Sequence, residues 1–137
     1  MTAGYSGTPL AKKLGIKEGF TVLAVGAPDD YESLVEPLPA NARIVSKGRE
    51  LDIIHFFTNS RDGLFRGLAE YKSLIKQDGM IWVSWYKKAA KLPTEITEDT
   101  VREAAFPLGL VDVKVCAVDD KWSGLKLVIR KELRSTI

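Results

Sequence analysis

The chain has 137 residues, the length of one ordinary domain, so we expect a single domain over residues 1–137. Its residues are 45% hydrophobic and 28% charged, a composition typical of globular proteins that excludes a disordered chain. The net charge of +2, from 20 basic and 18 acidic residues, is too balanced for a dedicated nucleic-acid-binding protein.

The cysteine content and the hydropathy limit the kinds of site and the cellular compartment that we expect. A single cysteine, Cys116, excludes an internal disulfide and a cysteine-rich metal cage. No apolar run approaches the ~20 residues that cross a bilayer, and Met1–Thr8 is polar and rich in glycine, unlike a signal peptide. We therefore expect a soluble cytoplasmic protein with no membrane contact and no metal site. The oligomeric state is left open.

The first half of the chain predicts alternating helices and strands. Thr8 is a good N-cap, Pro9 suits the first position of a helix, and Gly15 would end that helix. The apolar segment that follows is typical of a strand inside a covered parallel sheet. The expected elements are a helix at Pro9–Leu14, a strand at Gly19–Gly26, a helix at Asp30–Glu36, a short strand at Arg43–Val45 and a central strand at Leu51–Phe57.

The second half predicts two longer helices and three strands. Ser60 is the expected N-cap of a helix whose apolar residues recur at helical spacing from Leu64 to Ile75. The last two strands alternate apolar and polar residues around a short joint, which predicts an antiparallel hairpin at one edge of the sheet. The elements after the first helix are a turn at Asp78–Gly79, a strand at Met80–Trp85, a polar loop with Lys87, Lys88 and Lys91, a helix from the cap Thr97 to Pro107, and strands at Val111–Val118 and Ser123–Lys131.

This order of elements predicts an α/β fold, a doubly wound Rossmann-like sheet that is mostly parallel and has a C-terminal antiparallel strand. In such sheets, ligands bind outside the carboxyl ends of the strands. The stretches expected at that edge are Gly26–Asp30, Thr58–Arg61, Ser84–Lys88 and Asp119–Ser123. This edge is the default binding site on geometric grounds.

Two resemblances follow from particular segments. Lys17–Gly26, Leu51–Ile54 and Asp78–Val83 resemble the strand pattern of class I S-adenosylmethionine-dependent methyltransferases. Ala3–Ala11, the run Trp82-Val83-Ser84-Trp85, and Gly109–Asp119 resemble an uncharacterised bacterial domain-of-unknown-function family of small proteins. The second resemblance covers nearly the whole chain, and it implies the fold without implying an activity.

The cofactor motifs of the methyltransferases are weak in this chain. Their loop after the first strand usually runs acidic-x-Gly-x-Gly-x-Gly, because glycines let the backbone approach the ligand. Here the corresponding stretch, Ala24–Asp30, holds one glycine, Gly26, and a proline, Pro28. Ser46–Gly48 stands where an acidic residue would hold the ribose, and the third of the usual seven strands is missing with its helix. We therefore expect no S-adenosylmethionine and no other cofactor.

The strongest candidate site in the residues themselves is an anion site. Ser60 opens a helix whose N–H groups and dipole attract anions, and Arg61 could add a bidentate contact. Lys87 and Lys88 follow the neighbouring strand and could close the other side. The alternative is that Ser60 is only a helix cap and the cations are only solvated.

The other candidates each have a structural alternative. Asp29, Asp30 and Asp119 could bind a hydroxyl or amine, or could serve only helix initiation and turn formation. Trp85 and Trp122 could stack on a flat ligand, or could pack in the core. His55, the only histidine, lies mid-strand among apolar residues, which favours a hydrogen-bonded core histidine.

Three hypotheses about function remain. The favoured one is a non-catalytic methyltransferase-like domain that binds a small anionic ligand or a protein partner at the edge of the sheet where the carboxyl ends of the strands lie. The second is an S-adenosylmethionine-dependent methyltransferase with a degenerate loop, so whether the chain is an enzyme stays open. The third, a nucleic-acid-associated protein, would use Lys87, Lys88, Lys91, Arg130 and Lys131, but the balanced charge disfavours it.

Overall fold

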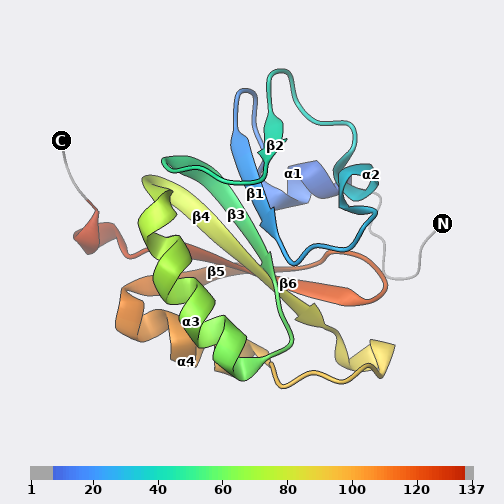
Figure 1. The fold of residues 1–137 in the computed structure, drawn as a ribbon, viewed down its shortest axis with the longest axis vertical. Coiled ribbons are helices and arrows are strands. Elements are labelled where there is room, and N and C mark those ends of the chain that lie inside the picture. The colour runs from blue at the N-terminus through green and yellow to red at the C-terminus, as the bar shows by residue number, and fades with distance from the viewer. Residues whose placement is uncertain (1–7, 135–137) are drawn as a thin grey trace.

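One mixed sheet is the centre of the fold. The computed structural model describes residues 8–134, and within them six strands lie in the order β2-β1-β3-β4-β6-β5 (Figure 1). The first four strands in this order run parallel, and β6 is antiparallel to both of its neighbours. The predicted α/β fold, with a mostly parallel sheet and an antiparallel C-terminal strand, is confirmed. The strands are β1 (Thr21–Val25), β2 (Arg43–Val45), β3 (Leu51–Phe57), β4 (Ile75–Tyr86), β5 (Leu110–Ala117) and β6 (Trp122–Ile129).

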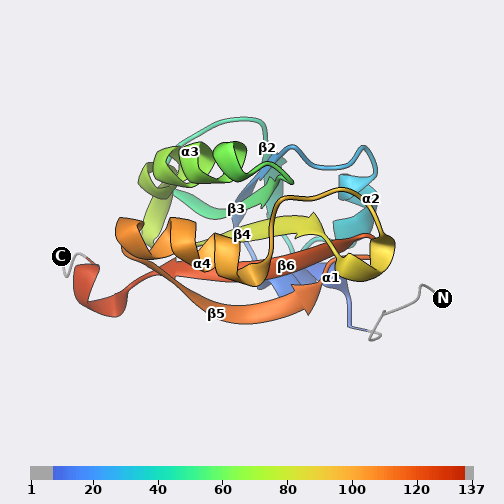
Figure 2. The same cartoon turned by 90° about the horizontal axis from the view of Figure 1, so that it is seen from below.

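Helices cover both faces of the sheet (Figures 1 and 2). α1 (Leu10–Leu14) and α2 (Tyr31–Val35) pack on one face, the α1–α2 face. α3 (Arg61–Tyr71) and α4 (Glu98–Ala105) pack on the other, the α3–α4 face. None of the helices within residues 8–134 combines the length and apolar character needed to cross a bilayer. Single 3₁₀ turns occur at Lys72–Leu74, Lys88–Ala90, Phe106–Leu108 and Lys131–Leu133.

An unusually short connection joins β2 to β3. These two strands flank β1 and run parallel to it, yet only residues 46–50 connect them. Parallel strands usually need a crossover of a dozen or more residues. The short crossover is possible here because β2 has only three residues, so the chain has little distance to return. The strand and helix expected to be missing from the methyltransferase pattern are absent from this connection.

The predicted start of α3 is confirmed, but α3 ends earlier than predicted. The side chain of Ser60 accepts a hydrogen bond from the Gly63 N–H at 3.1 Å, which confirms the predicted cap. The helix ends at Tyr71, and Ile75 begins β4 opposite Leu51. The predicted helical position of Ile75 was wrong, because four-residue spacing from Tyr71 does not reveal the intervening 3₁₀ turn.

Two further local predictions were wrong and two were right. The predicted turn at Asp78–Gly79 lies inside β4, which is continuous from residue 75 to residue 86. Pro9, and not Thr8, occupies the N-cap position of α1. Gly15 does end α1 in the left-handed conformation, and Thr97 does cap α4 by accepting a hydrogen bond from the Thr100 N–H.

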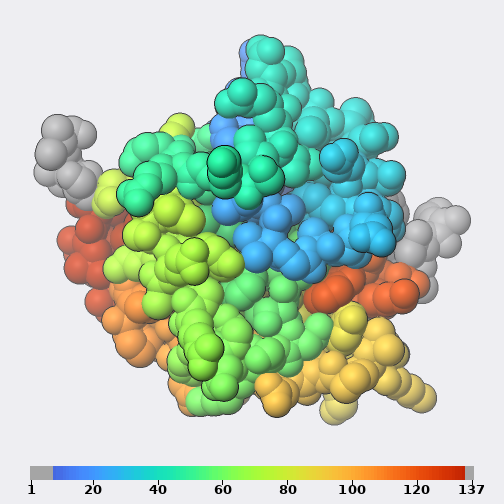
Figure 3. All heavy atoms as spheres, in the orientation of Figure 1, coloured from blue at the N-terminus to red at the C-terminus, as the bar shows by residue number. Residues whose placement is uncertain are grey.

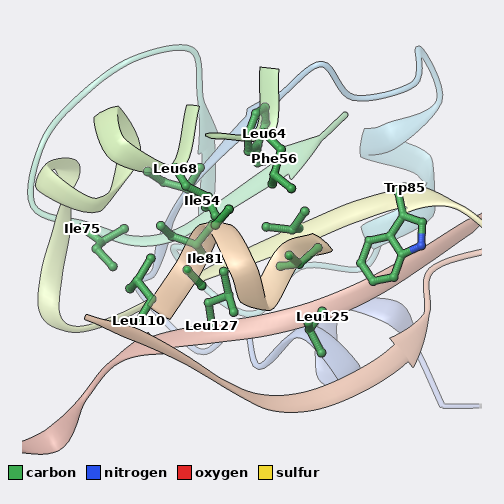
Figure 4. Packing of buried hydrophobic residues seen from close by; sticks show 14 of the residues in the cluster. Ile54, Phe56, Leu64, Leu68, Ile75, Ile81, Trp85, Leu110, Leu125 and Leu127 are labelled. Carbon is green, nitrogen blue, oxygen red and sulfur yellow. The ribbon is translucent and has the colours of Figure 1, made fainter. Parts of the chain in front are cut away.

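The larger core cluster lies on the α3–α4 face (Figure 4). Alternate residues of the central strands, such as Ile54, Ile81 and Leu127, point into it and are fully buried. Gly67 lets α3 lie close to the sheet, because a Cβ there would come within 2.4 Å of the Phe56 ring. In Figure 3 the yellow-green atoms of α3 lie across the middle of this side of the molecule. Close packing therefore fixes α3, and with it the edge of the sheet where α3 begins.

Candidate functional site

The carboxyl ends of the parallel strands share one edge of the sheet, as the strand directions predict. Val25 pairs with Phe56, and Phe57 pairs with Ser84. β6 starts at the same edge, because Trp122 lies opposite Tyr86. The four predicted stretches after or before these strand ends therefore meet along one line, although they do not form one pocket.

A cavity of about 860 Å³ lies at this edge, at the end of β4. We call it the β4-end groove. β4, β5 and β6 supply one side of it, and the loop from Lys87 to Thr97 and the start of α4 supply the other. Figure 2 shows this loop running from the turn after β4 to α4. The lining residues are Trp85, Tyr86, Lys87, Lys88, Leu92, Pro93, Thr94, Ile96, Thr97, Glu98, Asp99, Val115 and Ser123.

Asn59 fastens the loop that borders the groove. Its side-chain oxygen accepts a hydrogen bond from the Tyr86 N–H at 2.8 Å, and its carbonyl accepts one from the Glu95 N–H at 2.9 Å. The Lys87 N–H in turn donates to the Lys121 carbonyl at 2.8 Å. These bonds tie the loop to the ends of β3, β4 and the β5–β6 hairpin, so the groove has a defined shape.

The start of α3, where an anion was expected, is already in contact with carboxylates of the chain. Glu95 accepts a hydrogen bond from the Arg61 N–H at 2.8 Å, and the Arg61 guanidinium is paired with Glu103. The Ser60 side chain is used as the cap. Lys87 and Lys88 line the β4-end groove, whereas Ser60 and Arg61 do not. Ser60 and Arg61 therefore do not line the same cavity as Lys87 and Lys88, and carboxylates of the chain itself already contact Arg61.

The acidic candidates lie away from the groove. Asp29 and Asp30 are exposed in the turn before α2, and Asp30 occupies its N-cap position without a side-chain capping bond. Asp119 accepts hydrogen bonds from the N–H groups of Lys121 and Trp122 at 2.8 and 2.9 Å. This arrangement is ordinary turn chemistry, the structural alternative for Asp119.

Both tryptophan candidates are buried. Trp85 lines the groove but is only 6% exposed, and it belongs to the core of the α3–α4 face (Figure 4). Trp122 packs on the α1–α2 face, with ring centroids 4.9 Å from Phe57 and 4.5 Å from Tyr86. Neither indole presents an open face for stacking on a ligand, so the packing alternative describes both.

His55 is a hydrogen-bonded core residue, as its mid-strand position predicts. Its Nδ1 lies 2.9 Å from the Tyr31 hydroxyl and its Nε2 lies 2.8 Å from the Ser84 hydroxyl. Burial lowers the pKa of His55 to about 3 and raises the pKa of Tyr31 above its usual value. The imidazole is therefore neutral, and in either neutral tautomer one nitrogen donates a hydrogen bond and the other accepts one. The three groups hold α2 onto β3 and β4.

Sequence reasoning missed several residues of the groove. Leu92 and Val115 are exposed apolar residues that line it. Leu92 and Pro93 interrupt an otherwise polar loop, which was a usable signal. For Trp85, the signal was its position in β4, because residues 81, 83 and 85 of a strand point to the same face and Ile81 and Val83 are apolar.

The basic residues proposed for nucleic acid do not share a surface. β4 and β6 are antiparallel, so Lys87 and Lys88 follow β4 at one edge while Arg130 and Lys131 follow β6 at the opposite edge. The single stripe that this hypothesis needs is therefore not formed. Within residues 8–134, no three His, Cys, Asp or Glu side chains gather in a way that could hold a metal ion.

Comparisons with known proteins agree with this fold. A family model described as a protein of unknown function (DUF3052) matches residues 11–131. No curated protein matches the chain significantly. Among solved structures, the chain is similar to an S-adenosylmethionine-dependent methyltransferase from Aquifex aeolicus, with a TM-score of 0.64 and 16% identity over 88% of this chain and 87% of that chain.

Two further structures are similar in the same way. A TehB-like S-adenosylmethionine-dependent methyltransferase from Corynebacterium glutamicum gives a TM-score of 0.56 and 14% identity over 93% of this chain and 91% of that chain. Fibrillarin from Aeropyrum pernix, crystallised with natively bound S-adenosylmethionine, gives 0.57 and 13% over 91% of this chain and 70% of that chain. At these identities the likeness shows the fold alone.

The residues at the ends of β1 and β2 do not fit S-adenosylmethionine as such methyltransferases hold it. Gly26 serves the sheet itself, because a Cβ there would lie 2.6 Å from the Phe57 carbonyl oxygen. The loop continues through Pro28, whose carbonyl accepts the Tyr31 N–H to form a turn into α2. Ser46–Gly48 follows β2 with no carboxylate. The repeated glycines and the acidic residue of the methyltransferase pattern are therefore both lacking, although Gly26 and Ser46–Gly48 line a cavity of about 500 Å³.

Proposed function

Because the chain belongs to the DUF3052 family of proteins of unknown function and has a methyltransferase-like fold, we propose that it is a non-catalytic binding domain. Its small anionic ligand or protein partner would occupy the β4-end groove. The observation that carries this proposal is the groove itself, a cavity of about 860 Å³ at the edge of the sheet where doubly wound folds bind ligands. That volume lies in the usual range for sites of small molecules, roughly 300–1,000 Å³.

The residues of the groove support binding more than catalysis. Its lining contains no histidine and no cysteine. The only histidine, His55, is buried on the α1–α2 face and bonded there to Tyr31 and Ser84. A nucleophile within reach of a general base is the usual minimum for covalent or acid–base chemistry, and no such pair lines this groove.

A fragment screen read by amide chemical shifts tests the proposal. The screen contains acids, amines and neutral fragments. We expect some of them to bind weakly and to shift the amides of residues 86–88, 92 and 94–99. Val115→Trp places an indole in the groove and should abolish these shifts. Val113→Trp is the matched control, because Val113 is equally exposed on the same strand (53% against 52%) but does not line the groove.

The same screen can contradict the proposal. If bound fragments shift Gly26 and residues 46–48 instead, the binding site lies at the end of β1. If Val115→Trp and Val113→Trp bind the fragments equally well, the groove is not the site.

A further inference from the structure

The charged side chains of the β4-end groove differ in whether they have partners. Glu98 and Asp99 lie in the first turn of α4, where the helix dipole favours negative charge. Both also contact the guanidinium of Arg102, at 3.7 and 2.9 Å. The helix and Arg102 therefore give each carboxylate of the groove a structural role.

The two lysines at the other end of the groove have no such role. Within residues 8–134, neither the Lys87 nor the Lys88 ammonium forms an ion pair. Their backbone is fixed, since Lys87 follows β4 directly and its N–H donates to Lys121. Lys87 and Lys88 are therefore two adjacent cations on a fixed segment. No carboxylate of the described residues pairs with them.

The groove also exposes apolar surface. Leu92 is 39% exposed and Val115 is 52% exposed, and they approach the groove from the loop and from β5. The buried residues Ile96 and Trp85 also line the groove and add to its apolar surface. Covering apolar side chains is worth about 25 cal/mol for each Å² removed from water, so a ligand with an apolar part gains affinity here.

We infer that the ligand is a small organic anion with an apolar body, an inference that rests on the proposed function. Lys87 and Lys88 bind its carboxylate or phosphate group, and its apolar part covers Leu92 and Val115. The pairing is complementary in charge at one end of the groove and in hydrophobicity along its side. A lysine ammonium recognises either head group as a point charge, so carboxylate and phosphate are the shared chemistry.

Four probes of equal chain length separate the head groups. They are decanoate, decyl phosphate, the neutral decanol and the cationic decyltrimethylammonium. Each is titrated into the ¹⁵N-labelled protein below its micelle concentration or, for decanol, below its solubility limit. We expect one or both anions to shift the groove amides with a dissociation constant about tenfold lower than that of decanol. The cation should bind more weakly than decanol. Binding of only one anion identifies the head group.

Charge-matched variants assign the effect to the lysines. Lys87→Gln with Lys88→Gln should raise the dissociation constant of the anions to that of decanol and leave decanol unchanged. Arg130→Gln with Lys131→Gln removes the same charge at the opposite edge and should change binding less than about twofold. Equal affinity for decanol and the anions, or an unchanged preference in the Lys87 and Lys88 variant, would overturn the inference. The groove would remain the proposed site if the fragment screen succeeds, so the two failures can be told apart.

Discussion

Acidification from pH 7.5 to pH 5.0 is expected to cost the protein roughly 2 kcal/mol of folding stability through His55 alone. Burial holds the pKa of His55 at about 3 in the folded state, and an unfolded chain restores it to about 6.5. Below pH 6.5 the unfolded chain binds a proton that the folded protein does not bind. The folding stability that depends on His55 being neutral is therefore present above pH 6.5 and is lost as the pH falls toward 3.

Urea unfolding at closely spaced pH values measures this effect, and two variants assign it. His55→Gln removes the titrating group. Its free energy of unfolding should be smaller than that of the wild type and should change little between pH 7.5 and pH 5.0. Ser84→Ala removes one hydrogen-bond partner of the imidazole but keeps His55, so its stability should still fall with pH. A pH dependence that is equal in the wild type and in His55→Gln would show that His55 does not supply it.

Gly26→Ala is expected to destabilise the fold by about 3 kcal/mol. Two costs combine at this position. Gly26 has a φ of +67°, where a residue with a Cβ costs roughly 1–2 kcal/mol. The new methyl group would also lie 2.6 Å from the Phe57 carbonyl oxygen, and a backbone atom in the middle of a sheet cannot move aside cheaply.

Gly19→Ala is the matched control for this prediction. Gly19 has a similar φ of +78°, but nothing lies within 4 Å of the position of its Cβ. It should cost only about 1 kcal/mol in the same unfolding experiment. If the two variants lose equal stability, crowding against β3 is not why residue 26 is a glycine. The positive φ alone would then account for the glycine.

Much of the sheet could be predicted because strand order and direction follow from local patterns. The apolar run Leu51–Phe57 indicated a central parallel strand, and the short joint before Trp122 indicated the antiparallel hairpin. The errors arose where tertiary contacts decide local structure. Asp78 and Gly79 read as a turn, but they lie inside β4, in the stretch between Ile75 and Met80 where the register with β3 is irregular.

The candidate site could be predicted less completely. Strand directions located the edge where the β4-end groove lies and brought Lys87 and Lys88 to it, because those inferences need only topology. They could not show that Glu95 and Glu103 contact Arg61, since these residues are distant in sequence. They also could not show which apolar residues stay exposed, because exposure depends on what the loop from Lys87 to Thr97 leaves uncovered.

We propose that this methyltransferase-like domain binds its ligand in the β4-end groove and binds no S-adenosylmethionine at the end of β1. Titration with S-adenosylmethionine and with S-adenosylhomocysteine, followed by amide shifts and calorimetry up to about 1 mM, tests it most directly, since that range detects binding as weak as about 4 kcal/mol. We predict no heat of binding and no saturable shift at residues 26–30 or 46–48. A micromolar dissociation constant with shifts in those two loops would contradict the claim.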